Sequence, residues 1–192
     1  MTTLHLDAKK TALVLIDLQN GIMAAPNPGP YTCAEVMKNA SRLAEAFRAK
    51  GGTVVYVRVN MNDFLRLPVD VSLRDPNAPA LPGSASELAP QSGYQAGDLV
   101  VTKRHWGAFA GTSLEHELRQ RGVETVVLGG VSTNAGVEST ARQGTGLGFA
   151  FVMVEDACTS SMGADAHRFA MEKIFPRLGR VRTTEEVVAA LG

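Results

Sequence analysis

The chain has 192 residues, 45% of them hydrophobic, which is the size and composition of a single globular domain with a complete core. Its 19 basic and 19 acidic residues give a formal net charge of zero, and no run of like charge occurs. This balance gives no electrostatic support for a nucleic acid or a membrane surface as partner. We therefore expect one domain, residues 1–192, whose partner is a small molecule.

The termini and the cysteines point to a reducing compartment. The opening segment MTTLHLDAKK lacks the apolar core of a signal peptide, and no stretch reaches the roughly 20 apolar residues that span a bilayer. Cys33 and Cys158 lie far apart and outside any CxxC or Cys/His ligand pattern, so we expect reduced thiols. These features predict a cytoplasmic protein.

Strand-like and helical segments alternate along the chain. Apolar, β-branched runs typical of strands buried on both faces occupy residues 11–17, 53–58, 99–103, 125–129 and 149–154, and a short polar edge strand is expected at 180–182. Helices are expected at residues 33–50, 113–121, 135–146, 164–174 and 184–191. The alternation predicts an α/β fold with a mostly parallel six-stranded sheet and helices on both faces.

One connection is much longer than the others. Residues 59–98 contain five prolines and little periodicity, whereas most connections have about 2 to 6 residues. Such a segment is either a surface excursion or oligomer contact, or a lid over the functional site.

Two charged side chains stand at predicted strand ends. Ligands of open parallel sheets bind at the carboxyl ends of the strands, where Asp17 ends VLID and Lys103 ends LVVTK. A lysine that leaves a buried strand needs a partner, so an Asp17/Lys103 pair is expected. The pair either braces two strands or transfers protons, with Lys103 holding the charge of Asp17.

The stretch GGVSTNAGVESTARQ, residues 129–143, follows the fourth predicted strand. If Thr133 or Asn134 caps the next helix, the free amides of Ala135 and Gly136 can receive a developing anion. Neither Ala135 nor Gly136 carries a nucleophile. Gly136 can equally serve close packing between helix and strand.

The motifs VLIDLQ, VTKRHWGAF and GVSTNAGVESTA, in this order and at strand ends, resemble the isochorismatase-like hydrolase superfamily, also called the cysteine hydrolase family. The resemblance covers nearly the whole chain and is greatest to YecD-type members, which share STNxGVESTAR. It implies a Rossmann-like three-layer α/β/α sandwich and a homo-oligomer, either a dimer or a tetramer. It also implies an Asp, Lys and Cys triad, whose positions here are Asp17, Lys103 and Gly136.

Gly136 departs from the family pattern because it replaces the nucleophilic cysteine. Cys158 follows another strand and is expected to be a buried structural thiol. Isochorismatases proper also lack that cysteine and cleave a vinyl ether by proton delivery followed by water attack. By this resemblance Asp17 is the acid, Lys103 its electrostatic partner, and Gly136 leaves an open pocket.

Further positions are expected to contact the substrate rather than a metal. Zinc-dependent relatives carry paired histidines after the second strand, where this chain reads RVNMNDF, so no metal and no other cofactor is expected. We assign substrate contacts to Gln19, Trp106, Thr133 and Ala135, although Gln19 can equally cap a turn.

The leading hypothesis is a hydrolase that cleaves an enol-ether or related C–O or C–N bond of a small anionic molecule without a thiol. A non-catalytic binding protein and a thiol-independent amidohydrolase are the alternatives.

Overall fold

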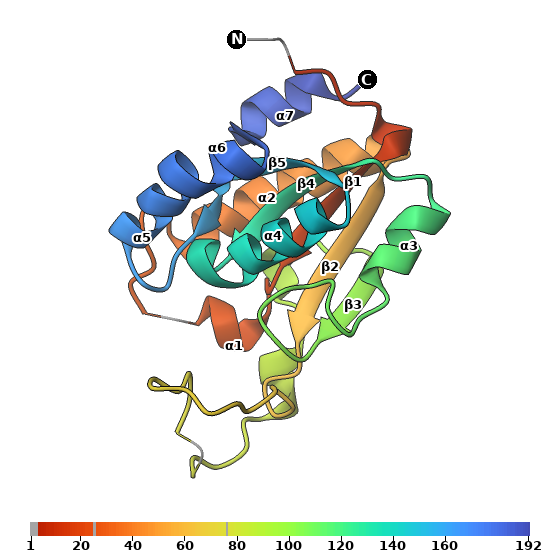
Figure 1. Ribbon diagram of the computed structural model, residues 1–192. Helices are drawn as coiled ribbons and strands as arrows, with labels where there is room; N and C mark the ends of the chain where they lie inside the picture. The colour runs from red at the N-terminus through yellow and green to blue at the C-terminus, as the bar shows by residue number, and fades with distance from the viewer. Residues whose placement is uncertain (1–3, 25, 76) are drawn as a thin grey trace.

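The computed structural model describes residues 4–24, 26–75 and 77–192. Its centre is one six-stranded sheet in the order β3-β2-β1-β4-β5-β6, in which every neighbouring pair is parallel (Figure 1). The strands are β1 (Thr11–Ile16), β2 (Thr53–Val59), β3 (Leu99–Lys103), β4 (Thr125–Val131), β5 (Ala150–Thr159) and β6 (Arg180–Arg182). The polar β6 forms one edge, as its sequence predicts.

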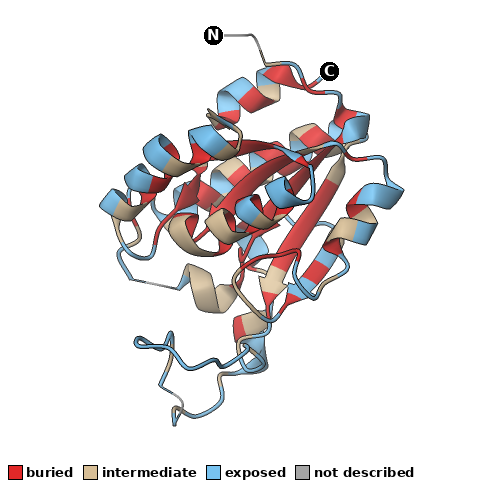
Figure 2. Ribbon diagram, in the orientation of Figure 1, coloured by how far each residue is buried: buried red, intermediate tan, exposed pale blue. Residues whose placement is uncertain are grey.

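Helices cover both faces of the sheet, which gives the predicted three-layer sandwich (Figure 1). One face packs against α2 (Cys33–Ala49) and α7 (Thr184–Ala190). The other face packs against α3 (Leu114–Gln120), α4 (Glu138–Gly146) and α6 (Phe175–Leu178), with α5 (Ala164–Phe169) beside them. The central strands are buried on both sides because each face has its own apolar layer (Figure 2).

Helix α2 forms where its sequence signals predict it. Thr32 and Glu35 make a reciprocal capping box at its start, and Gly51, in the left-handed region at φ +70°, follows its end. Its buried stripe packs on the sheet and comprises Val36, Ala40, Leu43, Ala44 and Phe47. The periodic apolar pattern therefore fixed both the extent and the facing of this helix.

Three predicted elements differ in form or extent. The expected helix over residues 135–146 begins instead as a π-helical turn, Thr133–Val137, and becomes α4 at Glu138. The last central strand was predicted to end at residue 154, but β5 continues to Thr159, because Gly130 and Val131 of β4 pair with its second half beyond a register shift. The helix predicted at 164–174 passes through a second π-helical turn, Ala170–Ile174, into α6.

The regular structure in the described part of the long connection between β2 and β3 is limited to two 3-10 turns, Gly83–Ser86 and Pro90–Ser92, and to isolated β-bridges at Leu88 and between Ala96 and Asp98. Its second half is held to the body by Arg48, which forms an ion pair with Asp98 at 2.6 Å. Its first half extends beyond the carboxyl ends of the strands and is largely exposed (Figures 1 and 2). The remaining short elements are the 3-10 turn Ala8–Lys10 and α1 (Asn20–Met23). None of the helices in the described part of the chain is long and apolar enough to cross a membrane.

Candidate active site

The strand order reverses between β1 and β4, and the carboxyl ends of these strands carry the candidate site. Asp17 directly follows β1, and the π-helical turn Thr133–Val137 follows β4. Lys103, the last residue of β3, reaches the same place with its side chain, since its Nζ lies 2.7 Å from Oδ2 of Asp17. The site therefore occupies the position where ligands of open parallel sheets bind.

Asp17 and Lys103 form a buried ion pair. Asp17 is 6% exposed and Lys103 2%, and the Lys103 ammonium also donates to the carbonyl oxygen of Trp106 at 2.7 Å. Burial raises the pKa of Asp17 to about 6, against the opposing charge and hydrogen bond of Lys103. The second carboxylate oxygen, Oδ1, is buried without a hydrogen-bond partner among the described residues. It is therefore the atom through which a bound substrate can meet the carboxyl group.

The backbone at Asp17 turns sharply to aim this carboxyl group. Asp17 has φ +55°, in the left-handed region that Asp tolerates better than most residues, and its amide donates to the carbonyl oxygen of Val57 at 2.8 Å. A side chain held in an uncommon backbone conformation at a strand end is typical of functional sites.

Gly130 allows β4 to approach β1 beneath the site, and sequence reasoning did not single it out. It has φ +122°, and a Cβ atom there would lie 2.2 Å from the carbonyl oxygen of Ile16. The available signal was the Gly129-Gly130 pair inside an apolar strand, a pattern that marks a bulge or a close backbone approach.

The turn after β4 differs from the capping scheme expected from the sequence. The peptide bond between Val131 and Ser132 is cis, and Ser132 is the residue that precedes the turn. The amide of Ala135 is not free, because it donates to the carbonyl oxygen of Ser132 at 3.0 Å. The expectation that Thr133 or Asn134 caps this turn is wrong, since no side-chain cap hydrogen bond forms there.

The side chains of Thr133 and Asn134 make tertiary contacts instead. Thr133 Oγ1 shares a hydrogen bond with Nδ1 of His167 at 2.8 Å, and both residues are buried. Asn134 Oδ1 accepts from the hydroxyls of Ser132 and Ser160 at 3.1 and 2.7 Å. These bonds attach the turn to β5 and α5, and sequence reasoning gave His167 no role.

Gly136 lies against the ion pair, and the expected open pocket at this position is wrong. A Cβ atom there would lie 3.0 Å from Cγ2 of Ile16 and 3.2 Å from both Asp17 Oδ2 and Lys103 Nζ. A side chain at this position would therefore be in tight contact with the charged pair, and its neighbours would have to shift by a few tenths of an ångström. Asp17, Lys103 and Gly136 do meet, as the three motifs predict.

Thr140 and Gln143 connect helix α4 to the segment that follows Lys103. The Thr140 hydroxyl donates to the carbonyl oxygen of Gly136 at 2.6 Å and accepts from the amide of Ala108 at 3.1 Å. Gln143 Oε1 accepts from the amide of Phe109 at 3.1 Å. The site turn and the segment after β3 are thereby held together.

Gln19, another of the predicted substrate contacts, forms hydrogen bonds to backbone groups of the protein itself. Its fully buried amide donates to the carbonyl oxygens of Val59 and Ala85 and accepts from the Val59 amide. The side chain joins the end of β2 to the 3-10 turn Gly83–Ser86, and it makes no cap hydrogen bond to α1, the helix that follows it. Trp106 is partly buried and contributes its carbonyl oxygen to Lys103, and a substrate role for its ring stays a prediction.

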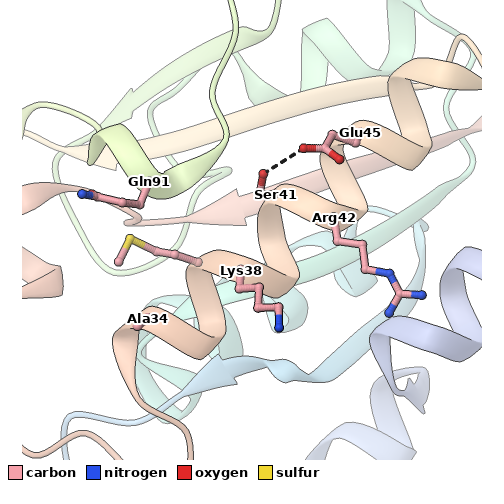
Figure 3. A pocket seen from close by; sticks show the side chains of 7 residues that line it. Ala34, Lys38, Ser41, Arg42, Glu45 and Gln91 are labelled. Atoms are coloured by element: carbon pink, nitrogen blue, oxygen red, sulfur yellow. Dashed lines mark hydrogen bonds between the residues drawn. The ribbon is translucent and has the colours of Figure 1, made fainter.

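Cys158 is fully buried in β5, and burial raises the pKa of its thiol to about 12. Within residues 4–24, 26–75 and 77–192, no three His, Cys, Asp or Glu side chains lie close enough together to hold a metal ion. A surface hollow of about 420 Å³ lies elsewhere, on the outer side of α2 beside Gln91, and its lining excludes the three site residues (Figure 3).

Comparison with known proteins places the chain in a family. The isochorismatase domain family matches residues 11–186. The isochorismatase family protein YecD of Escherichia coli O157:H7 is 46% identical over 98% of this chain and 100% of its own. The ureidoacrylate amidohydrolase RutB of Caulobacter vibrioides is 30% identical over 98% of this chain and 94% of its own. A solved isochorismatase family protein from Burkholderia thailandensis superposes with a TM-score of 0.89 at 41% identity, covering 98% of both chains.

The match spans the whole sheet, from β1 to α7, and includes each of the three segments that form the site. The chain belongs to the isochorismatase family of hydrolases.

Proposed function

We propose that the protein hydrolyses an enol-ether or related C–O or C–N bond of a small anionic molecule, by acid–base chemistry of Asp17 and Lys103 and without a thiol nucleophile. The observation that carries this proposal is the buried pair of Asp17 and Lys103 at 2.7 Å, with glycine at position 136 beside both charges. A carboxyl group with a pKa of about 6 is half protonated near that pH and keeps its proton in roughly a tenth of the molecules one pH unit higher, whereas an ordinary Asp would be almost fully ionised.

For an enol ether the proposed steps balance as follows. Asp17 gives its proton to the terminal vinyl carbon, and the double-bond electrons form the new C–H bond, which leaves an oxocarbenium ion. Water adds to the cationic carbon, and the resulting hemiketal expels the alcohol and becomes a ketone. The proton released by water returns to Asp17. Lys103 stabilises the carboxylate between these events, which lowers the barrier for proton donation.

Lys103 also has a donor left for the substrate, and the buried thiol does not compete with Asp17. A lysine ammonium has three donors, and Asp17 and Trp106 take up two of them within the described part of the chain. The third donor remains for an anionic group of the substrate. Cys158 is no rival nucleophile, since a thiol with a pKa of about 12 is protonated near neutral pH.

A second candidate is amide hydrolysis by water that Asp17 activates as a base. The relative named ureidoacrylate amidohydrolase favours this class of bond. It requires the ionised carboxylate of Asp17, whereas enol-ether cleavage requires the protonated form. An unactivated amide is also a poor electrophile for water, so we rank this candidate second.

The test incubates the pure protein with isochorismate and related enol ethers and measures pyruvate release. Asp17→Asn is expected to lower the rate about 10² to 10⁴-fold, the usual contribution of a general acid. Asp165→Asn, whose side chain is 90% exposed on α5, is the matched control and should keep the full rate. Equal rates for the wild type and Asp17→Asn would remove Asp17 from the chemistry.

The same assay separates the alternatives. Ammonia released from simple amides, unaffected by chelators and thiol-blocking reagents, would favour the amidohydrolase. A ligand that raises the melting temperature but is recovered intact after long incubation would favour a binding protein.

A further inference from the structure

His167 on α5 buries an imidazole ring beside the π-helical turn Thr133–Val137. The residue is 2% exposed, and its Nδ1 shares a hydrogen bond of 2.8 Å with the hydroxyl of Thr133, which is fully buried. The other ring nitrogen, Nε2, is buried without a partner among the described residues. The Tyr31 ring packs edge-on against the imidazole, with ring centres 5.8 Å apart. Within the described part of the chain, the polar contact of this ring is therefore directed at the turn.

The chemistry of the ring indicates what it does there. A buried polar ring with one unsatisfied nitrogen lowers stability, and an apolar side chain would fill the same place without this penalty. Burial lowers the pKa of His167 to about 4, and the titratable side chain packed against the ring, Tyr31, is neutral near pH 7, because burial raises its pKa. The neutral ring therefore offers Thr133 a directed hydrogen bond and no charge.

Thr133 is the first residue of the turn that carries Gly136. The start of the turn has no side-chain cap, so the tertiary bond of Thr133 fixes it from outside. Asn134, the next residue, is half-buried, and water can compete for its bonds to the neighbouring serines. At the other end Thr140 holds the carbonyl oxygen of Gly136. The bond between Thr133 and His167 is thus a wholly buried attachment at the start of the turn.

The turn in its present place covers the carboxyl group of Asp17. A Cβ atom on Gly136 would lie 3.2 Å from Oδ2 of Asp17 and 3.2 Å from Nζ of Lys103, so the backbone of the turn packs directly on the ion pair. Lys103 is the charged group that faces Asp17, and burial outweighs it and raises the pKa of Asp17 to about 6. A turn that moved away would admit water to the carboxyl group and remove the cause of this raised pKa.

We infer that His167 is a positioning residue, which acts through Thr133 to hold the turn against Asp17 and Lys103 and so keeps water away from the acid. The inference rests on the proposed function, since it explains how Asp17 keeps the proton that enol-ether cleavage uses. A hydroxyl bonded to an imidazole is also the arrangement of an activated nucleophile. The Thr133 hydroxyl is fully buried, however, so its bond acts on the turn.

The first test titrates the carboxyl group of Asp17 by ¹³C NMR in protein labelled at its aspartate side chains, with Asp17→Asn to assign the signal. The wild type should titrate near pH 6. Thr133→Val and His167→Leu break the bond and should lower the midpoint by about one pH unit, toward the value of an exposed aspartate. Thr133→Ser and His167→Asn can keep the bond and should keep the wild-type midpoint. Melting temperatures establish that each protein is folded, and Thr133→Val alone suffices if His167→Leu does not fold.

Thr184→Val is the matched control. Thr184 is the first residue of α7, on the other face of the sheet; it is 1% exposed, and its hydroxyl donates to Asp156 at 2.8 Å. This variant also loses a buried threonine bond, so its melting temperature should fall while the midpoint of Asp17 stays at the wild-type value. A wild-type midpoint in Thr133→Val would overturn the inference. Equal shifts in Thr133→Val and Thr184→Val would do the same, because they would reflect general destabilisation.

The second test follows the reaction. In Thr133→Val the pH above which kcat/KM for an enol ether falls should move down with the midpoint of Asp17, and a shift of one unit should lower kcat/KM at neutral pH about tenfold. A loss of rate that is equal at every pH, with an unchanged Asp17 midpoint, would give Thr133 a direct part in the chemistry and contradict the inference. The NMR titration needs no substrate, so a protein that fails to cleave enol ethers still decides whether His167 positions the turn.

Discussion

At the scale of single residues, the reactivity of Asp17 results from two opposed environments. Removal from water favours the protonated carboxyl group, and the Lys103 ammonium at 2.7 Å favours the carboxylate. Burial is the larger of the two, so the pKa settles at about 6 instead of the ordinary 3.8. An isolated buried carboxyl group would hold its proton too tightly to donate it, and an exposed one would have lost it. Burial therefore lets Asp17 keep its proton near pH 6, and the Lys103 ammonium lets it release that proton.

This balance predicts the pH dependence of the reaction. If protonated Asp17 is the acid, kcat/KM for an enol ether should be constant below the pKa of about 6 and fall tenfold per pH unit above it. Lys103→Met removes the charge that lowers this pKa. The break in the profile, the pH at which kcat/KM begins to fall, should therefore move to higher pH. The measurement is kcat/KM from about pH 5 to about pH 8.

Two outcomes would contradict this assignment. A rate that rises with pH through the same region would make Asp17 a base, as amide hydrolysis requires. A break that stays in place in Lys103→Met would mean that another group titrates. A conservative Lys103→Arg variant serves as control, because it keeps the positive charge and should leave the break near its original pH.

At the scale of elements, Thr140 connects two segments of the site. Its hydroxyl donates to the Gly136 carbonyl oxygen within the helix and accepts from the Ala108 amide of the segment that follows β3. Thr145, one turn later on α4, makes the same bond to the carbonyl four residues before it, that of Ala141 at 2.7 Å. The two threonines differ in the contact to Ala108 and in burial, since Thr140 is fully buried and Thr145 is exposed.

Replacing Thr140 by Val keeps the shape of the side chain but leaves the buried Ala108 amide without its acceptor. We expect Thr140→Val to lower the free energy of unfolding by about 1 to 3 kcal/mol, the usual penalty for an unsatisfied buried donor. Thr145→Val should change it by less than about 1 kcal/mol. Urea denaturation of both variants provides the measurement, and equal losses would refute a special role for the Thr140 contact.

The elements that sequence predicts best are those whose signal is local. Helix α2 carries its cap, its stripe and its terminating glycine in one continuous segment, and β3 and β6 begin and end where predicted. The second half of β5 was missed because the polar pair Glu155-Asp156 interrupts its apolar run, and its pairing depends on the distant Gly130.

The site shows the same division. Strand-end motifs predicted that Asp17, Lys103 and Gly136 meet, because parallel strands deliver their carboxyl ends to one edge. The bond between Thr133 and His167 joins residues 34 positions apart and leaves no periodic trace in the sequence. The close contacts around Gly136 likewise depend on how three separate segments pack, which spacing alone does not determine.

At the scale of the whole molecule, two buried groups tie stability to pH with opposite signs. Burial raises the pKa of Asp17 from 3.8 to about 6, so between these values the folded protein binds the extra proton, and this contribution to stability is lost as pH rises. Burial lowers the pKa of His167 from 6.5 to about 4, so the unfolded chain binds the extra proton, and this contribution is lost as pH falls. The two windows overlap almost completely.

We therefore expect the pH dependences that Asp17 and His167 give to the unfolding free energy to oppose each other in the wild type. Variants that remove one of the two groups should show the other dependence alone. Each group alone changes the unfolding free energy by at most about 1.4 kcal/mol per pH unit between about pH 4 and about pH 6. In Asp17→Asn only the His167 slope remains, so stability should rise with pH more steeply than in the wild type. In His167→Asn, whose amide can keep the bond to Thr133, only the Asp17 slope remains, and stability relative to the wild type should fall as pH rises.

Urea denaturation at several pH values measures both differences against the wild type. Carboxylates that titrate in all three proteins, such as the capping Glu35 and Glu186 with their lowered pKa values, cancel in the comparison. Parallel curves for the three proteins would mean that neither buried group changes its proton affinity on folding. The protonated form of Asp17 that the proposed chemistry needs would then be absent as well. The burial that destabilises its carboxylate is the same burial that makes it an acid near neutral pH.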